Sequence, residues 1–252
     1  MILNIHLEHC DDNGERLERL LKINKPLIIS VVPVLLLPKH ESFRNGIYPS
    51  GYYYPKRVVD ILKDNADNPN LFFGQQGFTH YCPDCLKRKE ERDPWHENRC
   101  LYDIEKTVKC QKAFMERGKR VIEKVLGSTP VLYVPPNHQF DKHSKIAAEK
   151  LGFKFFSVKK ILDIKPYKEK KLIILPEGDL GEADIVYIHY DEIAKDFDKY
   201  LEIIENSKSI YEISPLKQST DLISKNEKAI ILKKKERDSK KQEKKLANRI
   251  AD

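Results

Sequence analysis

Four short segments carry histidines, carboxylates and amides that could do chemistry, and each follows an apolar run. They are EHCDDNG at 8–14, QQGFTHYC at 75–82, PPNHQFD at 135–141 and IHYDE at 188–192. When parallel strands are covered by helices, functional side chains gather at the carboxyl ends of the strands. The four segments therefore predict one convergent site at one end of a sheet.

The aspartate pair of the first segment fits metal-assisted hydrolysis. Asp11 and Asp12 are neighbours that point in different directions, so one can bind an ion while the other accepts a proton from an activated water. A second interpretation is that DDNG only caps a helix that begins at Gly14. The sequence leaves both interpretations open.

Half of the histidines lie in these segments. Four of the eight are placed in this way, namely His9, His80, His138 and His189. His189 could act as a general acid or base, with Asp184 or Asp191 to orient its ring. The alternative is a core histidine that only satisfies a hydrogen bond.

Apolar runs that alternate with helical patterns define the elements that would position these segments. The predicted strands are residues 1–7, 26–37, 70–74, 130–134, 153–158, 172–175 and 184–190. The predicted helices are residues 13–23, 56–65, 103–126, 141–151 and 191–206. Strands that are apolar on both faces indicate an α/β fold with a parallel sheet covered by helices. This pattern suits either an incomplete (β/α) barrel or a doubly wound sheet.

In order and spacing, the four segments resemble the motifs of the polysaccharide deacetylases of the carbohydrate-esterase type, and most closely their uncharacterised deacetylase-like relatives. The aspartate pair stands where that family has one after its first strand, and QGFTH at 76–80 stands where it has His-x-x-x-His. YVPPNHQFD, FKFFSV and VYIHYDE occupy the places of the later motifs, so the resemblance covers residues 1 to about 205. It implies a distorted, incomplete (β/α) barrel of about seven strands.

The resemblance also implies a role for each matching position. Asp11 would accept the proton of a metal-bound water. Asp12 and His80 would bind zinc or another divalent ion, and His189 would protonate the leaving amine. Gln76 stands in the place of a metal-binding histidine, although a neutral amide is a poor zinc ligand.

A second departure from the family pattern lies in the proline segment. Tyr133 or Val134 stands where the family has an arginine that orients the base. His9, Cys10 or His138 could replace the missing ligand, because all three are expected at the same end of the sheet. The sequence does not decide among them.

A cysteine cluster follows the second segment directly. Its spacing is C-x2-C-x10-H-x3-C, formed by Cys82, Cys85, His96 and Cys100. This spacing is typical of a structural zinc site, and a metal could fold the highly charged loop between these residues. A redox pair and unconnected buried thiols are the alternatives. Cys110, in the long helix, is expected in the core.

Composition limits the class of protein. The chain has 252 residues, of which 40% are hydrophobic and 34% charged, and no apolar run is long enough to span a bilayer. The first residues do not resemble a signal peptide, so we expect a cytoplasmic protein with reduced thiols. Of the net charge of +7, +5 comes from residues 233–252, where nine basic residues face four acids. A solvated helix explains such a tail better than an arm that binds nucleic acid.

Two regions and three functions follow. Residues 1–215 are expected to form the barrel, with a Cys/His insertion at 82–100, and residues 216–252 are expected to form a charged, helical extension. The favoured function is a metal-dependent hydrolase that removes an acetyl or other acyl group from an N-acylated sugar or oligosaccharide, or from a similar amide. The alternatives are a catalytically degraded barrel that binds a ligand, and a nucleic-acid-binding zinc protein. No membrane partner is expected.

Overall fold

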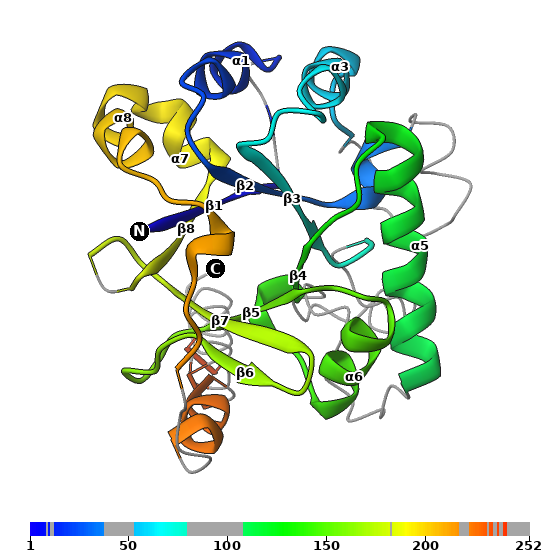
Figure 1. Ribbon diagram of the computed structural model, residues 1–252, viewed down its shortest axis with the longest axis vertical. Helices are drawn as coiled ribbons and strands as arrows, with labels where there is room; N and C mark the ends of the chain where they lie inside the picture. Colours follow the sequence, from blue (N-terminus) through cyan, green and yellow to red (C-terminus); the bar gives the residue numbers. More distant parts are fainter. Residues whose placement is uncertain are drawn as a thin grey trace, which may run out of the picture.

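Seven parallel strands close into a barrel in the computed structural model, which describes residues 1–8, 10, 13–37, 53–79, 108–181, 183–216, 222–230 and five positions between 232 and 240 (Figure 1). The strands are β1 (Ile2–Leu7), β2 (Leu27–Val31), β3 (Leu71–Gln76), β4 (Leu132–Val134), β5 (Phe155–Lys159), β7 (Leu172–Gly178) and β8 (Ile185–His189). The ring closes because β5 pairs with β7 and β8 pairs with β1. The predicted barrel of about seven strands is confirmed.

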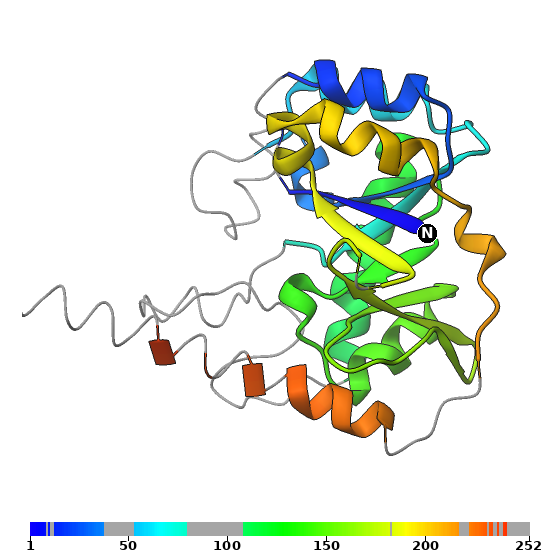
Figure 2. The ribbon, with the colours of Figure 1, turned by 90° about the vertical axis from the view of Figure 1, so that its left-hand side faces the viewer.

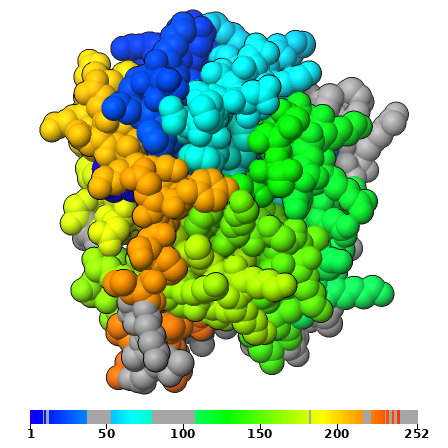
Figure 3. Space-filling view, in the orientation of Figure 1, coloured from blue at the N-terminus to red at the C-terminus, as the bar shows by residue number. Residues whose placement is uncertain are grey.

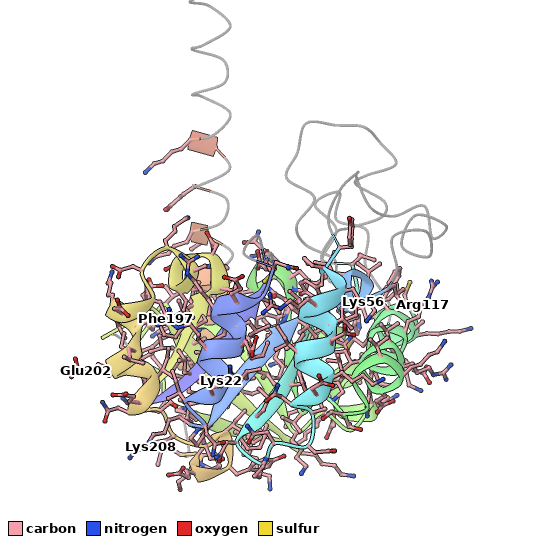
Figure 4. The ribbon with its side chains drawn as sticks, turned by 90° about the horizontal axis from the view of Figure 1, so that it is seen from above. Lys22, Lys56, Arg117, Phe197, Glu202 and Lys208 are labelled. Atoms are coloured by element: carbon pink, nitrogen blue, oxygen red, sulfur yellow. The ribbon has the colours of Figure 1, made fainter. Side chains whose placement is uncertain are left out.

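Helices cover the outside of the barrel (Figure 1). They are α1 (Glu15–Lys22), α3 (Lys56–Asp64), α5 (Val108–Leu126), α6 (Lys142–Lys150), α7 (Tyr190–Lys195) and α8 (Phe197–Glu205). Each presents an apolar stripe to the strands; α1, for example, buries Leu17, Leu20 and Leu21. The opposite faces are charged, and Lys22 and Lys56 project from the ends of α1 and α3 into solvent (Figure 4).

Side-chain alternation along the strands separates the outer core from the barrel interior. In β1, Leu3, Ile5 and Leu7 pack in the large core cluster that also holds buried residues of α1, α3 and α8. The intervening residues Asn4 and His6 are buried as well, but they contact polar side chains of other strands. The barrel interior is therefore polar towards the carboxyl ends of its strands.

The amino end of the barrel is apolar and covered. A short 3₁₀ helix, η3 (Ile210–Glu212), lies across it, and the segment around η3 covers the centre of this face (Figures 2 and 3). Ile210 joins a buried cluster with Ile2, Phe155 and other apolar residues. Tyr211 packs edge-on against Phe72 and Phe155, with ring centroids 5.3 and 5.6 Å away. The η3 segment therefore closes the amino end of the barrel with apolar contacts, and we call it the apolar plug.

Several element boundaries differ from the prediction. The apolar run 26–37 is only partly a strand, because β2 ends at Val31 and the 3₁₀ helix η1 (Pro33–Leu36) follows. The predicted helix 191–206 is two helices, since Asp196 leaves helical geometry and caps α8. A short strand, β6 (Tyr167–Glu169), pairs antiparallel with β7 and was not predicted.

The expectation that Cys110 lies in the core is wrong. Its side chain is exposed on α5, whose buried stripe runs through Met115 and Ile122 instead. The helical period places the cysteine on the outer face, although its type favours burial.

Part of the predicted extension contacts the barrel. Residues 222–230 are helical, and the Asn226 side chain accepts hydrogen bonds from the backbone N–H groups of Ile161 and Leu162 at 2.9 and 2.8 Å. Lys145 of α6 forms an ion pair with Glu227 at 3.0 Å. The division of the chain at residue 215 stays a prediction.

Candidate metal centre at the carboxyl end of the barrel

Three side chains from two neighbouring strands converge at the carboxyl end. His6 and His189 are register partners on β1 and β8, and Glu8 follows β1 directly. One ligand atom from each of the three lies within 4.8 Å of the other two. Two imidazole nitrogens and a carboxylate oxygen are a donor set found in zinc sites, so these residues fit a divalent ion.

His189 is held between two carboxylates. Its Nε2 lies 3.7 Å from Glu8 Oε1, and its Nδ1 lies 3.2 Å from Glu192 Oε1. The interaction with Glu8, reinforced by Glu192, outweighs burial and raises the pKa of His189 to about 9. At neutral pH and without an ion, the ring therefore carries a proton.

His6 is almost completely buried and lies beside Glu177 of β7. The His6 Nε2 atom is 3.6 Å from Glu177 Oε2, and both side chains are at most 2% exposed. Burial raises the pKa of the Glu177 carboxyl, but its interaction with His6 and the hydrogen bond from Ser157 outweigh burial, so the net shift is downward. This carboxylate can orient the His6 ring, as carboxylates that hydrogen-bond metal-binding histidines do in metal sites.

A chain of hydrogen bonds fixes Glu177 inside the barrel. Asn4 Nδ2 donates to Glu177 Oε1 at 2.7 Å, and Ser157 Oγ donates to Glu177 Oε2 at 2.6 Å. Ser30 Oγ in turn donates to Asn4 Oδ1 at 2.7 Å. Gly74 leaves room for this chain, because a Cβ there would lie 2.1 Å from Ser30 Oγ. Side chains of β1, β2 and β5 thus fix the position of the Glu177 carboxylate, which faces His6.

Two rings lie beside the ring of His6. The rings of His138 and Tyr187 lie 5.9 and 5.3 Å from that of His6, and 5.2 Å from each other. Asn137 and His138 both have positive φ, at 53° and 51°, a costly geometry for residues other than glycine. Burial lowers the pKa of His138 to about 3, so its imidazole is neutral.

Gln76 lies at this end of the barrel, at the end of β3. Its Nε2 donates to Glu8 Oε1 at 2.6 Å, so the amide nitrogen rather than the oxygen faces the candidate ligand. Gln76 therefore contacts a candidate ligand. Its own role as a ligand stays a prediction.

The structure brings only part of the predicted site together. Of the predicted residues, His189, Gln76 and His138 lie at the carboxyl end. Cys10 is buried in the outer core. The others lie outside the described residues, namely His9, Asp11, Asp12, His80, Cys82, Cys85, His96 and Cys100. Their roles stay predictions.

The partner predicted to orient His189 differs from the one observed. Asp184 pairs with Lys165, and Asp191 pairs with Lys195. Glu192 contacts His189 instead, because α7 begins directly after β8 and brings position i+3 back to the ring.

Four site residues were missed by sequence reasoning, namely His6, Glu8, Glu177 and Glu192. A signal existed for the first two, because Asn4, His6 and Glu8 alternate with the outward residues of β1. For Glu177, Pro176 interrupts the apolar run and hides the last residues of β7.

Comparison with solved structures identifies the fold. A family 4 carbohydrate esterase from Bacillus anthracis is 13% identical, with a TM-score of 0.47, over 89% of this chain and 82% of its own. A CE4 family pseudoenzyme from the same organism is 13% identical, with a TM-score of 0.49, over 84% of this chain and 63% of its own. The 4-alpha-glucanotransferase from Thermococcus litoralis is 11% identical, with a TM-score of 0.52, over 89% of this chain and 40% of its own.

At these identities the likeness concerns the fold alone, and the predicted barrel is shared with the 4-alpha-glucanotransferase, whose TM-score exceeds 0.5. No protein-family model and no curated protein matches the sequence. Among the described residues, no helix is long and apolar enough to cross a membrane.

Proposed function

We propose that the chain is a metal-dependent hydrolase that removes an acyl group from an N-acylated sugar or a similar amide. The convergence of His6, Glu8 and His189 at the carboxyl end of the barrel carries this proposal, because it supplies a metal-competent donor set where barrel enzymes place their chemistry. The type of reaction comes from the sequence motifs. A bound divalent ion would acidify a water molecule and polarise the scissile carbonyl.

Metal binding, orientation of the ligand rings and acceptance of the water proton are assigned to different residues. His6, Glu8 and His189 would hold the ion, Glu177 would fix the ring of His6, and Glu192 would fix the ring of His189. Asp11 remains the proposed acceptor of the water proton.

A competing assignment gives His189 the role of proton donor. The resemblance implies this role, and the raised pKa of about 9 supports it, because the ring is protonated at neutral pH. The variant His189→Gln separates the two roles. A ligand role predicts weaker metal binding, whereas a donor role predicts unchanged metal binding with loss of turnover.

The assay that tests the hydrolase uses purified protein with zinc, cobalt or manganese and acetylated chito-oligosaccharides or N-acetyl sugar conjugates. We expect amine release that stops on chelation and returns with metal, and that is lost in Asp11→Asn. Full turnover in Asp11→Asn would remove that residue from the mechanism, and turnover that survives chelation would contradict metal dependence.

A second candidate function is a binding protein built on a degraded active site. The hydrogen bond from Gln76 to Glu8 favours it, because an amide nitrogen, which cannot bind an ion, faces Glu8 from the position of a metal-binding histidine of the family. Metal analysis separates the two functions. The hydrolase predicts two ions per chain, one at the barrel mouth and one at the proposed clip of Cys82, Cys85, His96 and Cys100, whereas the binding protein predicts only the second.

A further inference from the structure

A lysine at the mouth of the barrel stands out by its surroundings. Lys159 is the last residue of β5 and shares its face with Ser157, which points into the interior and donates to Glu177. Lys159 Nζ lies 3.2 Å from the Tyr187 hydroxyl and 5.6 Å from the centroid of the Tyr187 ring. The same ring stacks on His6, so Lys159 is separated from the metal centre by one side chain.

Lys159 forms no direct ion pair within the described part of the chain, although the carboxylates of Asp179 and Glu177 act on the neighbouring Tyr187 hydroxyl. No described carboxylate lies within ion-pair distance of its Nζ, although the side chain is half-buried. The neighbouring Lys160 is paired with Asp163 at 3.1 Å, as is usual at a charged surface. A partly desolvated ammonium group is costly unless an anion accompanies it. Lys159 is therefore placed to meet an anionic group that enters the barrel mouth.

A second, independent observation points to a ligand at the same place. His138 is 8% exposed, and its Nδ1 is buried without a hydrogen-bond partner among the described residues. Buried polar atoms are nearly always satisfied by protein, water or ligand. The His138 ring lies 5.2 Å from that of Tyr187 and feels the charge of Lys159, so the ring with the unsatisfied nitrogen and the lysine are both neighbours of Tyr187.

We propose that Lys159, Tyr187 and His138 form a subsite for a negatively charged group of the substrate, so that the substrate is an anionic N-acylated sugar carrying a phosphate or a carboxylate. Lys159 supplies the charge, and the Tyr187 hydroxyl and the His138 ring supply directional hydrogen bonds. This inference rests on the proposed function for the N-acyl sugar, but the subsite binds its anion without an ion at the metal centre.

The other end of the same strand offers a matched control. Lys154, just before β5, lies 3.3 Å from the Tyr211 hydroxyl and 4.9 Å from its ring centroid, in the same type of lysine–tyrosine pair. That pair lies at the plugged amino end. Lys159→Met and Lys154→Met therefore remove the same charge and the same type of contact from opposite ends of the barrel.

The test is binding, measured by calorimetry on the metal-free full chain at low salt with N-acetylglucosamine and N-acetylglucosamine 6-phosphate. We expect the phosphorylated sugar to bind at least about tenfold more tightly, as one charge-assisted contact allows. Lys159→Met should remove this preference, and Lys154→Met should keep it. Equal binding of the two sugars, or a preference that survives Lys159→Met, would overturn the subsite.

Two further measurements distinguish a failure of the anion subsite from a failure of the proposed hydrolase function. Glu8→Gln should abolish turnover and keep the preference for the phosphorylated sugar; loss of the preference there would count against a subsite independent of the ion. Repeating the experiment with N-acetylneuraminic acid, which carries a carboxylate, and its methyl ester shows whether the subsite accepts a carboxylate as well as a phosphate.

Discussion

The two ends of the barrel are built from the same strands but have opposite character. At the amino end, Ile2 and Phe155 pack under η3, and Tyr211 closes the face with aromatic contacts. At the carboxyl end, the same strands β1 and β5 present His6 and Lys159 to a polar space. One end stabilises the fold, and the other places titratable groups together.

Burying polar side chains at the carboxyl end costs folding free energy, which the apolar amino end must offset. Burying His6 and Glu177 is unfavourable unless each is paired, and Asn4 and Ser157 supply hydrogen bonds for that purpose. The apolar plug offsets this cost by burying hydrophobic surface. Mutations at the two ends should therefore separate stability from function.

The largest effect on stability is expected at the amino end. Phe155→Ala removes a ring that is 2% exposed and contacts Tyr211, and should lower the free energy of unfolding by about 3–5 kcal/mol. Chemical denaturation measures the loss. Zinc affinity of the folded variant should stay within a factor of about two. A large loss of affinity would mean that the two ends are not independent.

The next effect is expected at the metal centre. Glu8→Gln removes the only carboxylate of the three-residue donor set, and should weaken zinc binding by more than roughly 100-fold, since even indirect partners are worth 10–100-fold. Competition with a chelator measures the affinity. Unchanged affinity in this variant would exclude Glu8 as a ligand.

A smaller effect on metal binding is expected at Glu177, which lies behind His6 in the barrel interior. Glu177→Gln keeps the shape of the side chain but removes the charge that faces His6, and should weaken zinc binding by about 10–100-fold. The same chelator competition applies. If the affinity stays at the wild-type value, the role of Glu177 is confined to stability.

The last effect concerns the pH dependence of stability near neutrality. The pKa of His138 is lowered to about 3 in the folded chain, whereas the unfolded chain binds a proton below about 6.5. The contribution of the neutral ring is therefore complete above pH 6.5, and is lost as the pH falls from 6.5 towards 3, by at most about 1.4 kcal/mol per pH unit.

Denaturation of metal-free wild type and His138→Gln at pH 7, 6 and 5 measures this dependence. The wild type should lose more stability than the variant over this range. Parallel curves would show that His138 is not buried in its neutral form.

The sequence predicted the seven strands because strands buried on both faces leave near-continuous apolar runs. It did not predict closure of the ring through β5 and β7, which depends on long-range pairing rather than on local pattern. At the site, His189 was found because it ends an apolar run. His6 was missed because it lies inside one, although its alternation with the apolar neighbours Ile5 and Leu7 was readable in the sequence as a second face of the strand.

The partner of His189 depends in the same way on where a helix begins. Because α7 starts directly after β8, Glu192 rather than Asp191 lies beside His189. A shift of one residue on a helix turns a side chain by 100°. Which of two adjacent residues contacts His189 therefore depends on the three-dimensional structure.

Anomalous diffraction at the zinc edge, from crystals of the full chain grown with zinc, tests the assigned ion site most directly. We expect an anomalous peak about 2.0–2.2 Å from a nitrogen of His6, a nitrogen of His189 and an oxygen of Glu8. A peak at a cysteine cluster would not bear on this site. A fully occupied zinc elsewhere at the barrel mouth, or no peak between these three side chains, would contradict the assignment.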